Sequence, residues 1–403
     1  MSNKILWKLN TIKVDKKADI DFLSQSEIEK ARKFHESFPQ YTKTPLVSLD
    51  NLSKKLGLEG IYVKDESYRF GLNAFKVLGG SYAMSKYLAQ KLGKDISELD
   101  YEKLTSEKTR KQLGEITFVT ATDGNHGRGV AWTATQLKQK SVVYMPKGSS
   151  LTRLENIRKE GAEASITDMN YDDAVRLAAE NAKNYGWVVV QDTAWEGYED
   201  IPAWIMQGYG TMASEALEQL NSLGIEKPTH IFVQAGVGSF AGAVQGYFTS
   251  VFKNACPTTV IVEADEAACL YKSALQGDGR PQIVTGDMPT IVAGLACGEP
   301  NIIAWEVLKS YSSMFASCPD WVAAKGMRML GNPLKGDERV ISGESGAVTL
   351  GLVAAIMTRA ELKDMREALK LDENSRVLLF STEGDTDPDK YRSIVWDGEY
   401  PSY

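Results

Sequence analysis

Residues 115–145 read EITFVTATDGNHGRGVAWTATQLKQKSVVYM, and this stretch decides the fold. An apolar run at 116–120 is followed by a polar segment with glycines, an amphipathic stretch at 128–138 and a second apolar run at 141–145. Apolar runs that alternate with helical periodicity predict strand–helix–strand units. Such units build a parallel sheet, so this part of the chain is predicted to be α/β.

The same alternation extends in both directions along the chain. It continues with a helix at 151–160, a strand at 164–167, a helix at 172–184 and a strand at 187–191. A second series consists of strands at 229–234, 259–263 and 376–381, with a helix from Ala241. The stretches 201–223 and 345–359 are predicted to be packing helices, the second almost entirely apolar. Two α/β modules follow from this pattern.

Composition limits the classes of function. The 403 residues suffice for two domains, and the net charge of −7 argues against a nucleic-acid-binding protein, which would carry a basic face. No run of 18 apolar residues is present, and the basic N-terminal stretch has no apolar core of a signal peptide. We therefore expect a small-molecule ligand, no nucleic-acid or membrane partner, and a cytoplasmic location.

Histidine and cysteine are scarce, with three and four residues respectively. Metal sites and nucleophilic triads usually draw on these residues, so the sequence predicts chemistry built from other groups and no metal site. The cysteines at 256, 269, 297 and 318 form no CxxC pair, and reduced thiols are expected. A reversible disulfide between Cys269 and Cys297 is an alternative.

The loop after the strand at 229–234 reads AGVGSFAG, residues 235–242, and precedes a helix. Ligands of parallel sheets bind beyond the carboxyl ends of the strands. Glycines let backbone N–H groups converge on an anion at a helix N-terminus, so the loop suits a phosphate, although tight strand–helix packing would also explain it. The loop matches neither the P-loop nor the G-x-G-x-x-G pattern.

Two further loops stand out. TDGNHG at 122–127 opens a helix, where Asp and Asn serve as caps and His126 is first interpreted as a structural histidine. NAFKVLGG at 73–80 places Lys76 in an apolar, glycine-flanked stretch. A surface lysine is the ordinary interpretation. If Lys76 is buried, desolvation is expected to lower its pKa and provide a neutral amine for Schiff-base chemistry.

Taken in order, NAFK, GNHG, the glycine loop at 236–242 and STEGDTD at 381–387 resemble the fold type II pyridoxal-phosphate enzymes, the group of tryptophan synthase β and threonine dehydratase. The resemblance implies two open, mostly parallel twisted sheets flanked by helices, with the active site between two domains. It implies a larger domain from residues 1–80 and 200–403, a smaller inserted domain at 81–199, and a homodimer. Further stretches resemble the 2,3-diaminopropionate ammonia-lyases, namely IYVKDES, RFGLNAFK, TDGNHGRG, DMNYDD, VVQDTAWEGY and SGESGA.

The resemblance also implies roles in binding pyridoxal 5′-phosphate. Lys76 binds the cofactor covalently and then acts as a base at the substrate Cα, Phe75 lies beside the ring, and Asn125 lies against the 3-oxygen. Gly236, Val237, Gly238, Ser239 and Phe240 hold the phosphate. Ser381, with Thr382 as the alternative, meets the pyridine nitrogen. A neutral hydroxyl cannot protonate this nitrogen, which makes the ring a weaker electron sink.

For the substrate, the resemblance implies that Thr122, Asp123, Gly124 and His126 belong to the loop that binds the α-carboxylate. Asp123 stands where many relatives carry serine, and its carboxylate would repel an ordinary amino acid but attract a second ammonium group. Asp192 follows a strand and is a second candidate, although it could also cap the next turn. The implied reaction is α,β-elimination of D- and L-diaminopropionate to pyruvate and two ammonia, with Lys76 as base for the L-isomer and Asp123 for the D-isomer.

Three alternatives remain open at the level of sequence. A serine or threonine dehydratase shares the fold, and Asp123 is the feature that separates it from the predicted enzyme. A non-catalytic cofactor carrier or amino-acid sensor would be expected to lose Lys76 or the acids, which this chain keeps. A nicotinamide dehydrogenase is disfavoured because G-x-G-x-x-G is absent.

Overall fold

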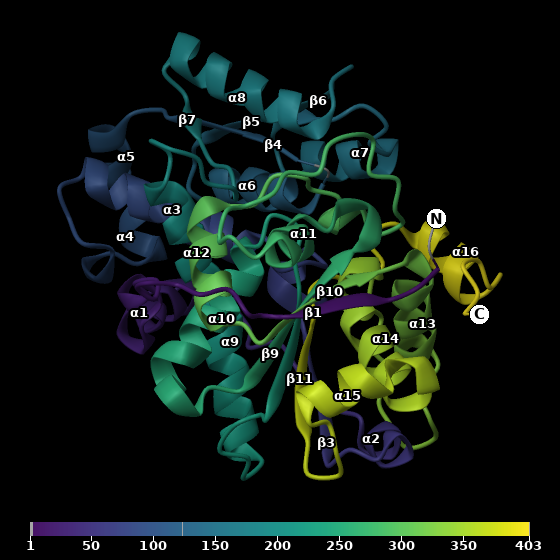
Figure 1. Ribbon diagram of the computed structural model, residues 1–403. Coiled ribbons are helices and arrows are strands. Elements are labelled where there is room, and N and C mark those ends of the chain that lie inside the picture. The colour runs from purple at the N-terminus through teal and green to yellow at the C-terminus, as the bar shows by residue number, and fades with distance from the viewer. Residues whose placement is uncertain (1–2, 123, 403) are drawn as a thin grey trace.

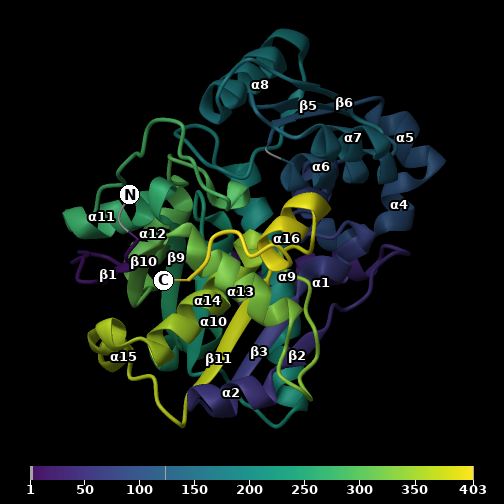
Figure 2. The ribbon, with the colours of Figure 1, turned by 90° about the vertical axis from the view of Figure 1, so that its right-hand side faces the viewer.

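Two separate β-sheets organise the computed structural model, which describes residues 3–122 and 124–402. A seven-stranded sheet has the order β1-β10-β9-β8-β11-β3-β2, and a four-stranded sheet has the order β6-β5-β4-β7. Figure 1 shows the smaller sheet above the larger one, and Figure 2 shows the same stacking from the side. The predicted α/β fold with two mostly parallel sheets flanked by helices is confirmed.

The larger sheet is parallel except at its edges, where β1 and β2 run antiparallel to β10 and β3. Its strands are β1 (Leu6–Leu9), β2 (Leu46–Ser48), β3 (Gly60–Asp65), β8 (His230–Gln234), β9 (Thr258–Ala264), β10 (Met314–Cys318) and β11 (Arg376–Ser381). All pairs in the smaller sheet are parallel. Its strands are β4 (Thr117–Ala121), β5 (Lys140–Met145), β6 (Glu163–Ile166) and β7 (Val188–Val189).

Helices cover both faces of each sheet. Those of the first half are α1 (Gln25–Glu36), α2 (Asp50–Leu56), α3 (Val77–Lys91), α4 (Tyr101–Thr105), α5 (Glu107–Leu113), α6 (Asn125–Gln136), α7 (Leu151–Lys159) and α8 (Tyr171–Tyr185). Those of the second half are α9 (Asp200–Ser222), α10 (Ser239–Phe252), α11 (Cys269–Gln276), α12 (Ile302–Tyr311), α13 (Asp320–Gly331), α14 (Glu344–Thr358), α15 (Lys363–Leu369) and α16 (Pro388–Val395).

Alternation along the strands divides the interior into two cores around the larger sheet. In β8, Ile231 and Val233 join the core formed with α1, α3, α9 and α10, whereas Phe232 joins the core formed with α13 and α14. Side chains of successive strand residues point to opposite faces, so a strand buried on both faces is apolar throughout. This explains why the central strands could be recognised as short continuous apolar runs.

The predicted elements are found with small shifts. The strand at 376–381 is confirmed without change, and the helix expected at 128–138 spans Asn125–Gln136, so that it begins within the TDGNHG stretch. The strand expected at 187–191 is shorter, because β7 is an edge strand that pairs only with β4. Strands β1, β2, β3 and β10 were not predicted. In β3, Lys64 and Asp65 interrupt the apolar run, yet all six residues are buried.

No single helix in the described part of the chain is both long and apolar enough to cross a membrane. The pair Glu344–Thr358 and Ala360–Leu369 passes that test together, but it is bent by 99°. The helix Glu344–Thr358 is buried along most of its length inside the protein.

Candidate active site

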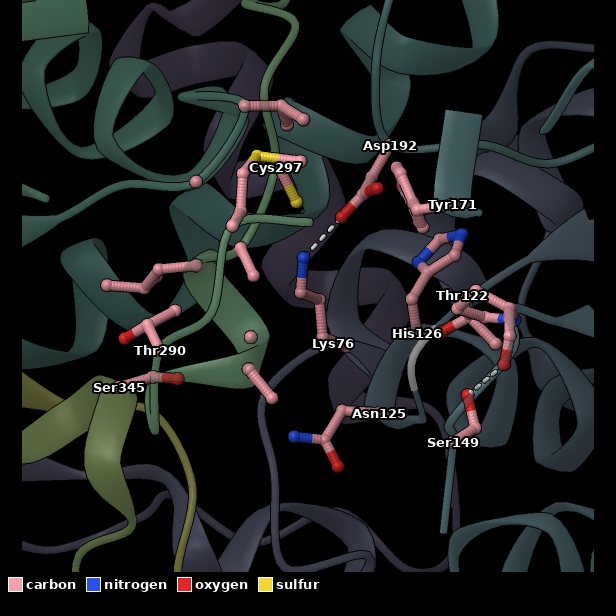
Figure 3. Close-up of a pocket in the computed structure, with 18 of the residues that line it drawn as sticks. Lys76, Thr122, Asn125, His126, Ser149, Tyr171, Asp192, Thr290, Cys297 and Ser345 are labelled. Carbon is pink, nitrogen blue, oxygen red and sulfur yellow. Dashed lines mark hydrogen bonds and ion pairs between the residues drawn. The ribbon is translucent and has the colours of Figure 1, made fainter. Parts of the chain in front are cut away.

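A cavity of about 950 Å³ lies where the carboxyl ends of both sheets meet. Its walls include residues that follow β4, β5 and β7 on one side and β8 and β11 on the other. The largely irregular segment between α11 and α12 contributes residues 286–290 and 293–297 to the wall. Figure 3 shows Lys76 reaching into this space between Asp192 and Asn125.

Lys76 stands directly before α3, and its side chain is 23% exposed. Its Nζ forms an ion pair with Asp192 Oδ2, the bond drawn in Figure 3. Burial alone would lower the pKa of Lys76, but the charge of Asp192 and the hydrogen bond between them hold it above its usual range. The expectation that a buried Lys76 has a lowered pKa is therefore wrong for this state of the protein, because a counter-ion lies beside the amine.

Asp192 follows β7 and is almost fully buried. Burial alone would raise its pKa, but the charge of Lys76 lowers the pKa of Asp192 to about 2. Tyr209 donates from its hydroxyl to the same carboxylate oxygen at 3.4 Å. The carboxylate therefore contacts the amine inside the cavity, and its hydrogen bonds among the described residues go to Lys76 and Tyr209 and cap no turn.

The loop that carries Lys76 is held by buried charges and by strand-like bonds. Arg69 is fully buried and is bonded to Glu66 at 2.8 Å and to Glu215 at 2.7 Å. Phe75 N–H donates to the Thr382 carbonyl at 3.0 Å. An unpaired buried charge is costly, so this network favours one position of the segment. The Lys76 loop is thus fixed to the residues that follow β11.

The glycine loop leads from β8 into α10, and its residues 235–240 line the cavity. Gly238 has φ +100°, a conformation that strongly favours glycine, and α10 begins at Ser239. The Ser239 hydroxyl donates to the Asp192 backbone carbonyl and accepts from Asn301 Nδ2 at 2.7 Å. The loop therefore directs the N-terminus of a 14-residue helix at the cavity, which suits an anion such as a phosphate.

Asn125, the first residue of α6, donates from Nδ2 to Glu383 Oε2 at 2.5 Å. Glu383 is 4% exposed and also accepts from the Thr386 hydroxyl at 3.1 Å. Both Asn125 and Glu383 line the cavity. Glu383 was not among the predicted site residues, although it lies within the STEGDTD stretch. The only signal for it in the sequence is its place just after a strand.

Of the two hydroxyls offered for the pyridine nitrogen, Thr382 lines the cavity and Ser381 is not among its lining residues. The Ser381 hydroxyl is fully buried and faces the Glu383 carbonyl at 3.4 Å. Successive residues at the end of a strand point in opposite directions, so only one of the two can face the cavity. The geometry favours the alternative, Thr382, over Ser381.

Thr122 and His126 also line the cavity, and their polar atoms shape the loop between β4 and α6. The Thr122 hydroxyl accepts from Gly124 N at 3.0 Å and from Gly127 N at 3.2 Å. His126 donates from Nε2 to the Val190 carbonyl at 2.8 Å, which joins this loop to the segment that leads from β7 to Asp192. Asp123 lies outside the residues that the structure describes, so its predicted role stays a prediction.

Phe75 packs against Tyr209 and Phe240, and its ring centroid lies 4.8 Å and 4.9 Å from theirs.

All four cysteines are free. Cys269 Sγ lies 3.7 Å from the Cys297 carbonyl, so the two residues are neighbours without a disulfide. Within the described residues, no cluster of three or more His, Cys, Asp and Glu side chains could hold a metal ion.

These residues fit pyridoxal phosphate. The cavity combines a lysine amine, backbone N–H groups at a helix N-terminus, an amide and a hydroxyl. Gln234 Oε1 and Ser345 Oγ, from two lining residues, are buried with no hydrogen-bond partner. Buried polar atoms without partners are rare and are expected where a ligand binds.

Comparison with known proteins agrees with this geometry. The sequence model of a family described as "Pyridoxal-phosphate dependent enzyme" matches residues 38–383, and the chain belongs to this family. Two curated relatives are diaminopropionate ammonia-lyases. The enzyme from Salmonella typhimurium is 57% identical, covering 91% of each chain, and that from Escherichia coli K12 is 52% identical, covering 94% of this chain and 93% of its own. The chain is therefore a member of the diaminopropionate ammonia-lyase family.

Solved structures agree. The holo form of the Escherichia coli diaminopropionate ammonia-lyase superposes with a TM-score of 0.91 at 49% identity and covers 99% of this chain and 98% of its own. The same enzyme with an aminoacrylate–PLP azomethine reaction intermediate superposes with a TM-score of 0.90. Threonine deaminase isoform 2 from Solanum lycopersicum, at 19% identity and a TM-score of 0.71, shares the fold.

Proposed function

We propose that this enzyme removes ammonia from 2,3-diaminopropionate by a pyridoxal-phosphate-dependent α,β-elimination. The overall reaction consumes one diaminopropionate and one water and yields one pyruvate and two ammonia. The observation that carries the proposal is the ion pair of Lys76 and Asp192 in a cavity beside the glycine loop. The high identity to curated diaminopropionate ammonia-lyases supports the choice of substrate.

Bound pyridoxal phosphate supplies an electron sink that stabilises negative charge at the Cα of an attached amino acid. Gly236 to Phe240 would hold its phosphate, Asn125 its 3-oxygen and Thr382 its ring nitrogen, while Phe75 would pack beside the ring. Lys76 would bind it covalently. The support is the place of these residues around one cavity.

Lys76 acts as the base for the L-isomer by taking the Cα proton at its Nζ. A charged amine cannot accept a proton, so the amine must first become neutral, which the hold of Asp192 opposes. Binding of a substrate ammonium group by Asp192 would satisfy the carboxylate and weaken its hold on Lys76. The β-amine then leaves as ammonia, and the released 2-aminoacrylate hydrolyses to pyruvate and the second ammonia.

Asp123 acts as the base for the D-isomer, on the opposite face of Cα. The proposal rests on the unusual carboxylate in the TDGNHG stretch. It is tested by measuring pyruvate and ammonia release from each isomer by Asp123→Asn. We expect a loss of about 100-fold or more on the D-isomer and a smaller loss on the L-isomer. Equal retention of activity on both isomers would contradict the two-base proposal.

The general proposal is tested with purified protein and added pyridoxal phosphate. The wild type should turn yellow and release pyruvate from both isomers of diaminopropionate faster than from serine or threonine. Lys76→Ala should lose the visible band. A protein that takes up no cofactor would overturn the proposal, and a preference for serine or threonine would indicate a dehydratase instead.

Three further features belong to the same proposal. Residues 81–199 would form a smaller domain inserted in a larger one made of 1–80 and 200–403, supported by the position of β4 to β7 within this range. A homodimer is supported by exposed Leu6 and Leu9 on the free edge strand β1, and sedimentation velocity would test it. A cytoplasmic location is supported by four unpaired cysteines, since reducing compartments keep thiols free.

A further inference from the structure

Gln234, the last residue of β8, places a buried amide group at the wall of the cavity. Its Nε2 donates to the Phe380 carbonyl at 3.0 Å and to the Thr382 hydroxyl at 2.8 Å. A backbone carbonyl can only accept, so the nitrogen and not the oxygen of this amide must face Phe380. The orientation of the Gln234 amide is thereby fixed, and both of its N–H groups are used.

The consequence falls on the Thr382 hydroxyl, which has one proton and two lone pairs. One lone pair accepts the bond from Gln234, and within the described residues the hydroxyl donates to no protein group. Thr382 is 3% exposed and lines the cavity. The proton of this hydroxyl can therefore form a hydrogen bond to a ligand. If residue 234 offered an acceptor instead of a donor, the hydroxyl would donate to residue 234.

The oxygen of the Gln234 amide shows that this orientation lowers the stability of the folded protein. Its Oε1 is buried and has no hydrogen-bond partner, and Gln234 is 2% exposed. A buried polar atom without a partner typically costs about 1–3 kcal/mol. A side chain chosen for stability alone would avoid this cost, so the donor groups of Gln234 indicate a functional constraint on Thr382.

We propose that Gln234 is a positioning residue that makes Thr382 a hydrogen-bond donor to the ring nitrogen of pyridoxal phosphate. The inference rests on the proposed function, in which Thr382 meets this nitrogen. A donor hydroxyl forms a bond only to a nitrogen with a free lone pair, and a protonated ring nitrogen would oppose one donor with another. Gln234 therefore acts through Thr382 to keep the ring nitrogen unprotonated and to limit how strongly the ring withdraws electrons.

The chemical consequence is a bias toward elimination. A protonated ring stabilises a long-lived carbanion at Cα, which permits slow side reactions such as transamination. An unprotonated ring favours short-lived carbanions that expel the β-amine at once. Gln234 thus contributes to reaction specificity without touching the substrate.

The test replaces Gln234 by glutamate and measures the ¹⁵N chemical shift of ¹⁵N-labelled pyridoxal phosphate bound to the protein. In Gln234→Glu an oxygen replaces Nε2. This oxygen carries at most one proton, and that proton is used in the hydrogen bond to the Phe380 carbonyl. Thr382 must then donate to residue 234 and present a lone pair to the ring. We expect the wild-type nitrogen to resonate as an unprotonated ring and the variant to shift toward the value of the free cofactor in acid.

Four matched variants complete the experiment. Thr382→Ser keeps the hydroxyl and should give the wild-type shift. Thr382→Val, alone or with Gln234→Glu, should give one common shift, because Gln234 acts only through the hydroxyl. Gln234→Met, which is similar in size, removes the donor and leaves the Thr382 hydroxyl free to rotate, so it should move the shift in the same direction as Gln234→Glu but less, and it covers the case in which the glutamate variant does not fold.

Two results would overturn the inference. One is an unchanged ¹⁵N shift in Gln234→Glu and Gln234→Met, and the other is an equal effect of Gln234→Glu with and without the Thr382 hydroxyl. Failure of the proposed function looks different, because the wild type itself would then show no visible band and no bound ¹⁵N signal.

Discussion

Lys76 and Asp192 illustrate how a buried pair can set the starting state of a reaction. Burial opposes a charge on either group, but each charge stabilises the other, so the pKa of Lys76 is held up and that of Asp192 is held down to about 2. At neutral pH both are charged in the structure. Any reaction that needs a neutral Lys76 must therefore first relieve the contact with Asp192, and a cationic group of a substrate can do this.

Replacing Asp192 by asparagine tests this balance. Without the carboxylate, burial is no longer opposed, so the pKa of Lys76 should fall by about 1 unit or more, and to below its ordinary value. The measurement is the pH dependence of Lys76 modification by an amine reagent in cofactor-free protein, read by mass spectrometry. Asp387→Asn is a suitable control, because Asp387 also lines the cavity and asparagine can replace it as the cap of α16. An unchanged pH profile in Asp192→Asn would contradict the argument.

At the residue scale, sequence reasoning found side chains whose motifs are local. Lys76, Asn125 and the glycine loop stand in short, recognisable stretches, and all of them line the cavity. Glu383 and Gln234 were missed because their meaning lies in partners that are far away in the chain. Glu383 contacts Asn125 across 258 residues, and Gln234 contacts Thr382 across 148. No local pattern encodes such contacts.

At the scale of elements, close helix packing supports the residues behind the cavity. A Cβ atom added at Gly326 in α13 would overlap the Ala347 carbonyl in α14, and one at Gly351 in α14 would overlap the Val322 carbonyl in α13. The two glycines thus let the backbones of α13 and α14 approach each other. Because α14 begins at Glu344, beside Ser345 in the cavity wall, this packing also fixes one side of the site.

Gly326→Ala should therefore destabilise the protein by about 3 kcal/mol or more, since backbone atoms cannot move aside as a side chain can. Chemical denaturation of the cofactor-free protein measures the change. Gly80→Ala in α3 is the matched control, because its added Cβ would meet nothing closer than 3.7 Å. Alanine is the better helix former, so this control should be neutral or stabilise by up to about 1 kcal/mol. Similar losses in both variants would show that packing is not the cause.

The sequence predicted elements best where both faces of a strand are covered. The central strands β8, β9 and β11 are continuous apolar runs, and their positions were predicted to within one residue. Edge strands carry a weaker signal, because β1 and β2 have only four and three residues and take their place by pairing with distant strands. Strand β3 was missed since Lys64 is charged; its buried amine is satisfied by an ion pair with Glu215 and by hydrogen bonds to the Thr44 carbonyl and to Gln219.

At the scale of the whole molecule, titrating groups in the interior make stability depend on pH. Glu263 at the end of β9 is 1% exposed and accepts from the N–H groups of Leu270 and Tyr271 at 2.8 and 2.6 Å. Burial raises the pKa of Glu263 from 4.5 to about 8 in spite of these bonds. Between these two pH values the folded protein holds a proton that the unfolded chain has lost, so stability falls as the pH rises through this window.

Glu263→Gln should remove this pH dependence, because glutamine does not titrate; it keeps an oxygen acceptor for one of the two α11 N–H groups, so the variant's stability is lower at every pH. Urea unfolding at pH 5 and pH 8 should show that the wild type loses several kcal/mol more than the variant over this interval, with an upper limit of about 4 kcal/mol for one proton over three pH units. The comparison of the wild type with Glu263→Gln cancels the contributions of all other titrating groups. Equal pH dependence of wild type and Glu263→Gln would mean that Glu263 is already ionised in the folded protein, and that hydrogen bonds at the N-terminus of α11 outweigh burial.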